Sequence, residues 1–412
     1  MENMNSIQQL VDSIHEADTD NTLTEKDNYI FELIKEYVGK NGATGKQEQR
    51  KLLLDVIGRD HNLVNSTVIN KLIHEGIISD DDLWGIGIKQ VFIDTLGQNL
   101  KSEKYPLPSK ALDKVENPST EVYFWGIPAS GKTCAIGALL SVAVKRDLPM
   151  LNCYEAGKCQ SQAYQEKLTE MFPYDRNGST KVMPLPSGTS IDNTYEMFFE
   201  LTDKKNNVLP ITFIDMAGEL IRCMYKKNKG LSLNKQEEKA LQTVTNVLKD
   251  NRTDNRKIHI FVLEYGGENR KYENISQTNY LSGAISYLKE IECEDGEKFN
   301  VFKDVTDAIY LMVTQVDKSG QKDENLKEHI RHYIESESNY INIADQLKKI
   351  CEDNHINRDK LAVILFSLGE VCFKDYCMFS PRFTRNALEI LLSHIYNYKK
   401  WQKKTWYQKL LS

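Results

Sequence analysis

The chain has 412 residues, of which 40% are hydrophobic and 27% charged, and its formal net charge is −6. This length predicts two or three domains, and these proportions are ordinary for a globular protein. No apolar run approaches the roughly 18–20 residues that cross a membrane, and the polar, acidic start does not fit a secretory signal, so we expect a cytoplasmic protein. The eight cysteines include no C-x-x-C pair, which favours reduced structural thiols over a zinc site.

Residues 1–105 are acidic and have a helical pattern. They hold 11 Lys and Arg against 18 Asp and Glu, a balance that disfavours nucleic acid as a partner. Apolar residues at helical spacing predict helices at 7–16, 27–38, 48–57, 67–75 and 86–96. We expect this helical N-terminal domain to recruit a protein partner or to self-associate. The prolines that follow it predict a linker at 106–118.

The next feature, from Gly126 to Thr133, matches the Walker A pattern G-x-x-x-x-G-K-[ST]. An apolar run precedes it and a helical run follows it, which is the strand–loop–helix arrangement of a phosphate-binding loop, or P-loop. The loop amides and Lys132 would bind the β- and γ-phosphates of a nucleoside triphosphate, and the Thr133 hydroxyl would ligate Mg²⁺. The candidate phosphate-binding residues are Gly126, Pro128, Ala129, Ser130, Gly131, Lys132, Thr133 and Cys134.

From residue 121 onward, short apolar runs alternate with helical stretches. The runs at 211–214, 258–263, 308–313 and 361–366 suit strands that are buried on both faces. Helical stretches lie near 235–249, 277–292, 324–350 and 382–397. This alternation predicts an α/β, doubly wound and mostly parallel sheet, with the ligand beyond the carboxyl ends of the strands.

A second motif, Asp215-Met216-Ala217-Gly218-Glu219, directly follows one of these runs. A carboxylate at the end of a strand opposite a P-loop can hold the metal ion through a water molecule, which makes Asp215 a candidate metal ligand. The backbone N–H of Gly218 can contact the γ-phosphate and move when that phosphate leaves.

Two further loops at strand ends are candidates for binding the base. Asp317, in Thr314-Gln315-Val316-Asp317-Lys318, could accept hydrogen bonds from N1–H and the amine of guanine, a donor pair that adenine lacks. The backbone of Ser367-Leu368-Gly369, after the last apolar run, could reach the base O6. The candidate base-binding residues are Thr314, Gln315, Asp317, Ser367 and Leu368.

With these four motifs in order, residues 120–397 resemble the Ras-like GTPases of the translation-factor-related P-loop class. The Asp-x-Ala-Gly-Glu form is most similar to bacterial GTPases of the double-GTPase or conflict-system type, although only one P-loop occurs here. The resemblance implies GTP or GDP with Mg²⁺, and a P-loop domain at 119–397 whose sheet has six strands. One strand is expected to be antiparallel, within a hairpin of 194–202 and 211–215. A switch threonine should precede that hairpin, and we choose Thr189, with Thr194 as the alternative.

The resemblance also assigns chemistry. Lys132, Glu219 and Thr189 are the candidate catalytic residues for hydrolysis of the β–γ bond by water, and Thr133, Thr189 and Asp215 are the candidate metal ligands. Gln315 replaces a lysine whose stem stacks on the base in the family, and Glu219 replaces a glutamine that orients water in many members. An ATPase and a non-hydrolysing nucleotide-dependent scaffold therefore stay open as alternatives. Two arginines that could act in cis, Arg176 and Arg222, fit solvated surface positions better.

The last segment, 398–412, interleaves lysines with aromatic residues, and no acidic residue follows Glu389. Such a tail could bind an anionic membrane surface or, less favoured, nucleic acid. The favoured interpretation is a terminal helix that buries Trp401 and Trp406 and keeps its lysines in water.

Overall fold

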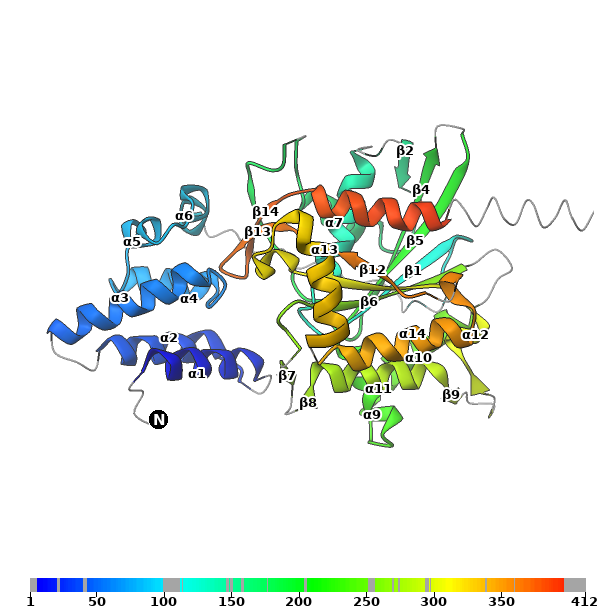
Figure 1. Cartoon of the computed structure of the whole chain (residues 1–412), viewed down its shortest axis with the longest axis horizontal. Helices are drawn as coiled ribbons and strands as arrows, with labels where there is room; N and C mark the ends of the chain where they lie inside the picture. Colours follow the sequence, from blue (N-terminus) through cyan, green and yellow to red (C-terminus); the bar gives the residue numbers. More distant parts are fainter. Residues whose placement is uncertain are drawn as a thin grey trace, which may run out of the picture.

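The computed structural model of the protein describes residues 6–20, 23–39, 43–98, 112, 114–145, 148, 151–156, 159–175, 177–203, 206–250, 256–268, 270–272, 275–292, 296, 298–337, 339–358 and 360–395. It consists of a helical N-terminal domain beside a larger α/β domain (Figure 1). Among the described helices, none combines the length and the apolar character that crossing a membrane requires. The predicted tail at 398–412 and Arg176 lie outside the described residues.

The described part of the N-terminal domain contains the helices α1 (Ile7–Thr19), α2 (Lys26–Gly39), α3 (Ala43–Arg59), α4 (Ser66–His74), α5 (Asp80–Gly85) and α6 (Gln90–Gly97). Their apolar side chains, such as Leu10, Ile34 and Leu72, share one core. The expectation of a single helix at 86–96 was wrong at its start. Gly87 has a φ of +90°, which no α-helix accommodates, so the chain turns there between α5 and α6.

A seven-stranded sheet forms the centre of the α/β domain, in the order β12-β11-β6-β1-β5-β4-β2. Its strands are β1 (Thr120–Trp125), β2 (Leu151–Ala156), β4 (Thr194–Asp203), β5 (Val208–Met216), β6 (Arg256–Glu264), β11 (Thr306–Thr314) and β12 (Ala362–Leu365). Strand β4 runs antiparallel to both of its neighbours, β5 and β2, while the other pairings described in this sheet are parallel, and β4 forms the predicted hairpin with β5. The six predicted strands are present, and β2 adds a seventh at the edge beside β4.

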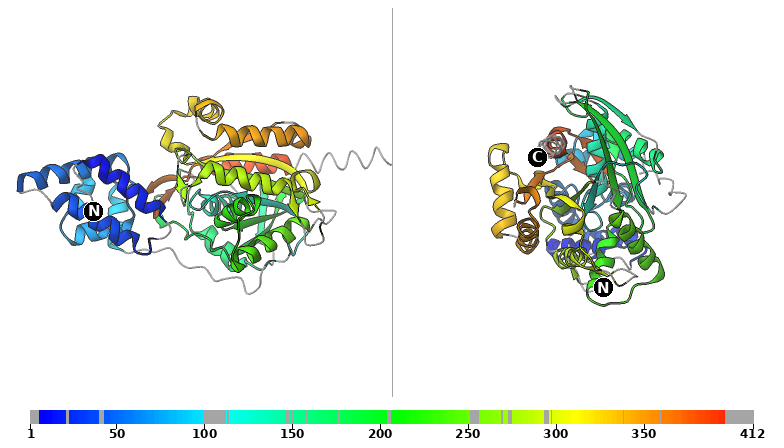
Figure 2. Two further views of the ribbon diagram at one scale, coloured as in Figure 1. Left: turned by 90° about the horizontal axis from the view of Figure 1, so that it is seen from below. Right: turned by 90° about the vertical axis from the view of Figure 1, so that its right-hand side faces the viewer.

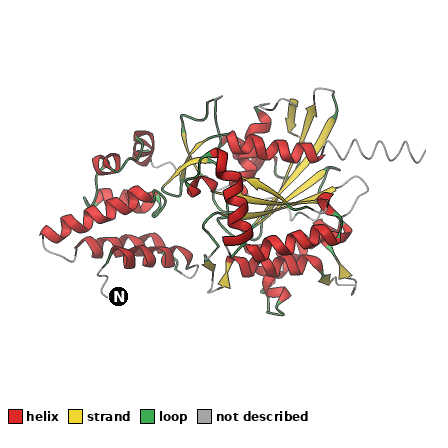
Figure 3. Ribbon diagram, viewed as in Figure 1, coloured by secondary structure: helices red, strands yellow, loops and turns green. Residues whose placement is uncertain are grey.

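Helices cover both faces of this sheet (Figure 3). One face packs against α7 (Lys132–Val144), α8 (Gln162–Glu170) and a last helix over residues 382–395. The other packs against α9 (Glu219–Asn228), α10 (Lys235–Lys249), α11 (Gln277–Lys289), α13 (Asp323–His332) and α14 (Ile341–Asp353). Strand side chains alternate between the two cores, as in Tyr123 and Phe124, which confirms the doubly wound α/β architecture.

Several short elements lie outside the central sheet and its covering helices. They are β7 (Lys271–Tyr272) with β8 (Ile275–Ser276), β9 (Ile291–Glu292) with β10 (Lys298–Phe299), the short helix α12 (Val301–Asp304), a 3₁₀ turn at Val316–Ser319, a π-helical turn at Tyr333–Glu337 and a second 3₁₀ turn at Ile356–Arg358. A separate three-stranded sheet has the order β13-β14-β3, with β3 (Val182–Pro184), β13 (Gly369–Cys372) and β14 (Tyr376–Phe379).

The β13–β14 hairpin connects the two domains (Figures 1 and 2). Phe373, at the tip of this hairpin, and Tyr376 are buried in the core of the helical domain, and so is Val182 of β3. Asp375 accepts hydrogen bonds from the backbone N–H and the hydroxyl of Ser66, at the start of α4, over 2.8 and 2.6 Å. The two domains therefore share an apolar core and a partly buried polar contact along this hairpin.

Candidate functional site

The segment that matches the Walker A pattern is the loop between β1 and α7. Gly131 has a φ of +89° and Ala129 a φ of +59°, so the loop coils tightly before α7 begins at Lys132. The positive end of α7 and the amides of the first turn face this loop, which is the geometry that binds phosphate. Ser130 is buried, and among the described residues its hydroxyl has no hydrogen-bond partner.

Lys132 folds back onto this loop. Its Nζ donates hydrogen bonds to the carbonyl oxygens of Gly126 and Ile127 over 2.8 and 2.9 Å. Burial lowers the pKa of Lys132 to about 8, because desolvation disfavours the ammonium, and the carboxylates of Asp215 and Glu219 partly oppose that shift. A buried cation whose hydrogen bonds go to neutral carbonyls is well placed to gain an anionic partner.

Gly218, at the start of α9, lies against the P-loop. A Cβ atom at this position would overlap the backbone of Pro128 and Ile127, so no other residue fits without moving one of the two segments. Glu219, the first residue of α9, is half-buried beside them. The structure thus brings the second motif into direct backbone contact with the first.

Three oxygen-bearing side chains that the sequence proposed as metal ligands converge beside the P-loop. The Thr133 hydroxyl donates to Asp215 over 3.0 Å, the Thr189 hydroxyl donates to the same carboxylate over 3.1 Å, and the two hydroxyls lie 3.3 Å apart. Thr194, the alternative to Thr189, instead begins β4 and pairs with Met216.

This oxygen cluster fits a hard cation. Asp215 is fully buried, and burial raises the pKa of its carboxyl while its hydroxyl neighbours and Lys132 lower it. A buried carboxylate with two hydroxyls offers the hard oxygen donors that Mg²⁺ prefers. The residues present therefore fit a magnesium ion held together with a bound triphosphate.

Sequence reasoning missed Tyr164, which belongs to α8. Its hydroxyl donates to Asp215 over 2.8 Å, and its ring stacks on Tyr195, with the ring centroids 3.8 Å apart. Tyr164 lies in no motif and only the packing of α8 beside β4 brings it to Asp215. No local pattern could have identified it.

The candidate base-binding residues lie at the ends of β11 and β12. The Thr314 hydroxyl shares its hydrogen between the carbonyl oxygens of Ser130 and Leu263, at 2.9 and 3.1 Å. It therefore connects the P-loop to the ends of β6 and β11. Gln315 adopts a left-handed conformation, with a φ of +58°, and leaves Asp317 exposed on the following 3₁₀ turn.

The loop after β12 lies next to this turn. Val316 N–H donates to the carbonyl of Phe366 over 3.4 Å, and the buried Ser367 hydroxyl accepts from Gly369 N–H over 3.1 Å. Leu368 is half-buried beside them and continues into β13. The two base-side loops are thus hydrogen-bonded neighbours.

Of two other sequence candidates, Arg222 points away from this cluster, whereas Cys134 directly follows Thr133. Arg222 points toward α10, where its guanidinium lies 3.5 Å from Glu237. Cys134, on the first turn of α7, is half-buried, and burial raises the pKa of its thiol to about 12. Within the described residues, no group of three or more His, Cys, Asp or Glu side chains could form a metal site by itself.

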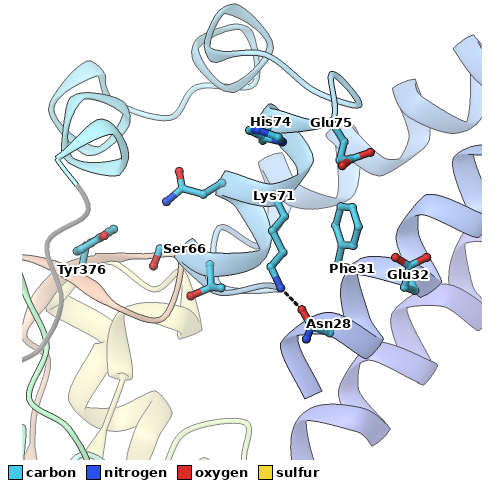
Figure 4. A pocket seen from close by; sticks show the side chains of 10 residues that line it. Asn28, Phe31, Glu32, Ser66, Lys71, His74, Glu75 and Tyr376 are labelled. Atoms are coloured by element: carbon cyan, nitrogen blue, oxygen red, sulfur yellow. Dashed lines mark hydrogen bonds between the residues drawn. The ribbon is translucent and has the colours of Figure 1, made fainter. Parts of the chain in front are cut away.

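A pocket of about 590 Å³ lies in the helical domain, away from the P-loop (Figure 4). It is formed between α2 and α4, and Lys71 donates a hydrogen bond to Asn28 across it. Tyr376 of β14 closes one end, beside Ser66. Its lining mixes polar, charged and aromatic groups and includes no buried, unpartnered polar side chain.

Comparisons with known proteins do not identify a family for this chain. No model of a protein family matches the sequence, and no curated protein matches it either. Among solved structures, the chain is similar to one described as nucleolar GTP-binding protein 1 from Plasmodium falciparum, at 13% identity and a TM-score of 0.29, over 74% of this chain and 98% of that one. It is also similar to chloroplast FtsY from Physcomitrella patens, at 13% identity and a TM-score of 0.20, over 92% of this chain and 97% of that one.

With TM-scores this low, neither likeness bears on the function of this chain. The order of the strands, the single antiparallel strand and the glycine-rich loop between β1 and α7 define the fold by themselves. It is the fold of a P-loop nucleoside triphosphatase, preceded by a helical domain.

Proposed function

We propose that this protein binds GTP with Mg²⁺ and hydrolyses it slowly, as a molecular switch. The observation that carries the proposal is the convergence of Lys132, Gly218 and the Thr133–Asp215–Thr189 cluster on one P-loop. Helix α7 and the loop amides would hold the phosphates, and Lys132 would leave its two carbonyls to bind the β- and γ-phosphates. A bound Mg²⁺ would supply neutralising charge on the triphosphate.

The remaining residues would act on water and on the switch. Glu219 would accept a hydrogen bond from the attacking water, but its charge is repelled by the triphosphate, and it cannot donate as a glutamine amide does. We therefore expect slow intrinsic turnover, on the order of 10⁻⁴–10⁻² s⁻¹ as for unassisted switch GTPases. Thr189 would close over the metal when the γ-phosphate is present and open when it leaves. A protein partner, or a second copy of the chain, would bind the helical domain with an affinity that depends on whether Thr189 is closed or open.

The choice of guanine over adenine depends on Asp317, and one substitution tests it. Asp317→Asn replaces an acceptor pair by one acceptor and one donor, so it should weaken GTP and strengthen xanthosine triphosphate, whose C2 oxygen accepts from the amide. Competition against a fluorescent nucleotide measures both affinities. The exposed Lys322→Ala variant, beyond this turn, should leave the order of preference unchanged. A wild-type protein that prefers ATP, or a preference that ignores Asp317→Asn, would make the protein an ATPase instead.

A further inference from the structure

Arg270, which no motif singles out, contacts the P-loop directly. It lies in the turn between β6 and β7, and its Nη2 donates to the carbonyl oxygen of Pro128 over 3.1 Å. Its other terminal nitrogen, Nη1, lies 2.7 Å from Glu264 Oε2. Both ends of one guanidinium are therefore engaged, one by the phosphate loop and the other by a carboxylate.

Glu264 extends this contact to the base-binding side. It is the last residue of β6 and pairs with Thr314 of β11. Its second oxygen, Oε1, lies 3.7 Å from Nζ of Lys318, the residue next to Asp317. The carboxylate of Glu264 thus lies between Arg270, which contacts the P-loop, and Lys318, on the turn that carries the base-binding candidate Asp317.

The turn around Glu264 is closely packed. A Cβ atom on Gly267 would come within 2.9 Å of Glu264 Oε2, and the amide of Gln277 holds the Gly267 carbonyl over 2.5 Å. The side chain of Glu264 is 11% exposed and that of Arg270 is 19% exposed, whereas a solvated surface pair such as Arg331–Glu335 has an arginine 73% exposed. On the base side Lys318 is 45% exposed, so the enclosed link there is the pairing of Glu264 with Thr314. Enclosed, charge-assisted contacts fix geometry in a way that exposed ion pairs do not.

The position of Arg270 also suits an anionic ligand. Its guanidinium contacts the carbonyl of Pro128, and Lys132 contacts the carbonyls of Gly126 and Ile127, so two cations lie on the loop that is proposed to bind phosphate. A triphosphate in the loop would carry the opposite charge to both.

We propose that Arg270, held by Glu264, is a positioning residue that fastens the P-loop to the Asp317 turn, so that one bridge aligns the phosphate and base ends of the site. This inference rests on the proposed function for its ligand. It predicts that breaking the bridge raises the dissociation rate of the nucleotide and also lowers the preference for guanine, although neither Arg270 nor Glu264 is proposed to touch the base. A residue that only stabilised the fold would change neither the base preference nor the dissociation rate of a folded protein.

The test uses the full chain and a fluorescent analogue of GDP, chased with excess unlabelled nucleotide. Arg270→Ala removes the charge-assisted hydrogen bond to Pro128, and Glu264→Gln removes the ion pair that holds Arg270, so each should speed dissociation by about tenfold. Inosine diphosphate (IDP) lacks the 2-amino group of GDP. The preference for GDP over IDP should fall in both variants because Asp317 is no longer aligned. Arg331→Ala, which removes an exposed pair, is the matched control and should behave as wild type.

Arg270→Lys keeps the charge but cannot span both partners, so it should dissociate faster than wild type and more slowly than Arg270→Ala. Folded variants with wild-type dissociation rates, or faster dissociation with an unchanged ratio of GDP to IDP affinity, would overturn the bridge. If Arg270→Ala fails to fold, Glu264→Gln and Arg270→Lys decide. If the wild type binds adenine rather than guanine nucleotides, the proposed function fails, and the same chase with ADP still tests the link from Arg270 to the P-loop.

Discussion

At the scale of single residues, the ionisation of Lys132 gives the site a pH signature. Burial lowers its pKa to about 8, whereas the ordinary value is near 10.5. A bound triphosphate stabilises the ammonium and raises this pKa again, so the bound state holds more protons than the free state near pH 8. Binding should therefore take up protons there, and affinity should fall as the pH rises above about 8.

Calorimetry in two buffers with different ionisation enthalpies measures this uptake. The apparent enthalpy of GTP binding should differ between the buffers at about pH 8 and converge at about pH 6, where Lys132 is already protonated. Equal heats in both buffers at pH 8 would show that Lys132 does not titrate in the free site.

At the scale of elements, the β13–β14 hairpin links the helical domain to the segment that leads to Thr189. The Asp375 carbonyl accepts from Leu185 N–H, directly after β3, over 2.6 Å, while its carboxylate binds the start of α4. Strand β3 pairs with β14, so Thr189 lies only a few residues beyond a strand that is fixed to the helical domain.

We predict that Asp375→Ala loosens the attachment of the hairpin to the start of α4, and through the hairpin also β3, although the backbone carbonyl that accepts from Leu185 is kept. Two hydrogen bonds to a carboxylate disappear, which should cost about 2–3 kcal/mol of local stability. Hydrogen exchange should become faster in the first turn of α4 and in β3, with little change in β1 or β6. Asp80→Ala, which removes an exposed carboxylate of α5, is the control. Unchanged protection of β3 would separate the hairpin from the switch segment.

Much of the α/β domain could be predicted because its signals are local. The strand, glycine-rich loop and helix around Lys132 are contiguous, and so is the hairpin that delivers Asp215. The meeting of Thr133, Asp215 and Thr189 also follows from the rule that ligands lie beyond the carboxyl ends of parallel strands.

The parts that sequence reasoning missed depend on packing between distant segments. Tyr164 reaches Asp215 from α8, and Arg270 reaches Pro128 across 142 positions of the chain. Neither residue belongs to a spaced pattern. The start of α6 was misplaced because the apolar periodicity continues through Gly87, whose backbone conformation ends the helix.

At the scale of the whole molecule, the expected independence of the two domains stays a prediction, and the shared core refines it. We predict that residues 110–412 fold and bind nucleotide by themselves but melt at a lower temperature than the full chain. The reason is that Phe373 and Tyr376 lose their apolar surroundings, at about 1.5–3 kcal/mol for each large side chain. Calorimetric unfolding of both proteins tests this, and a folded fragment without nucleotide binding would contradict it.

The central claim is that the loop from Gly126 to Thr133 binds a guanine nucleoside triphosphate. The most direct measurement is calorimetric titration of the full chain and of Lys132→Ala with GTP and with ATP, in the presence of Mg²⁺. We predict that the wild type binds GTP more tightly than ATP and that Lys132→Ala, while folded, loses most of its affinity for GTP. A folded Lys132→Ala protein with near-normal affinity for GTP would contradict the assignment of the phosphate site.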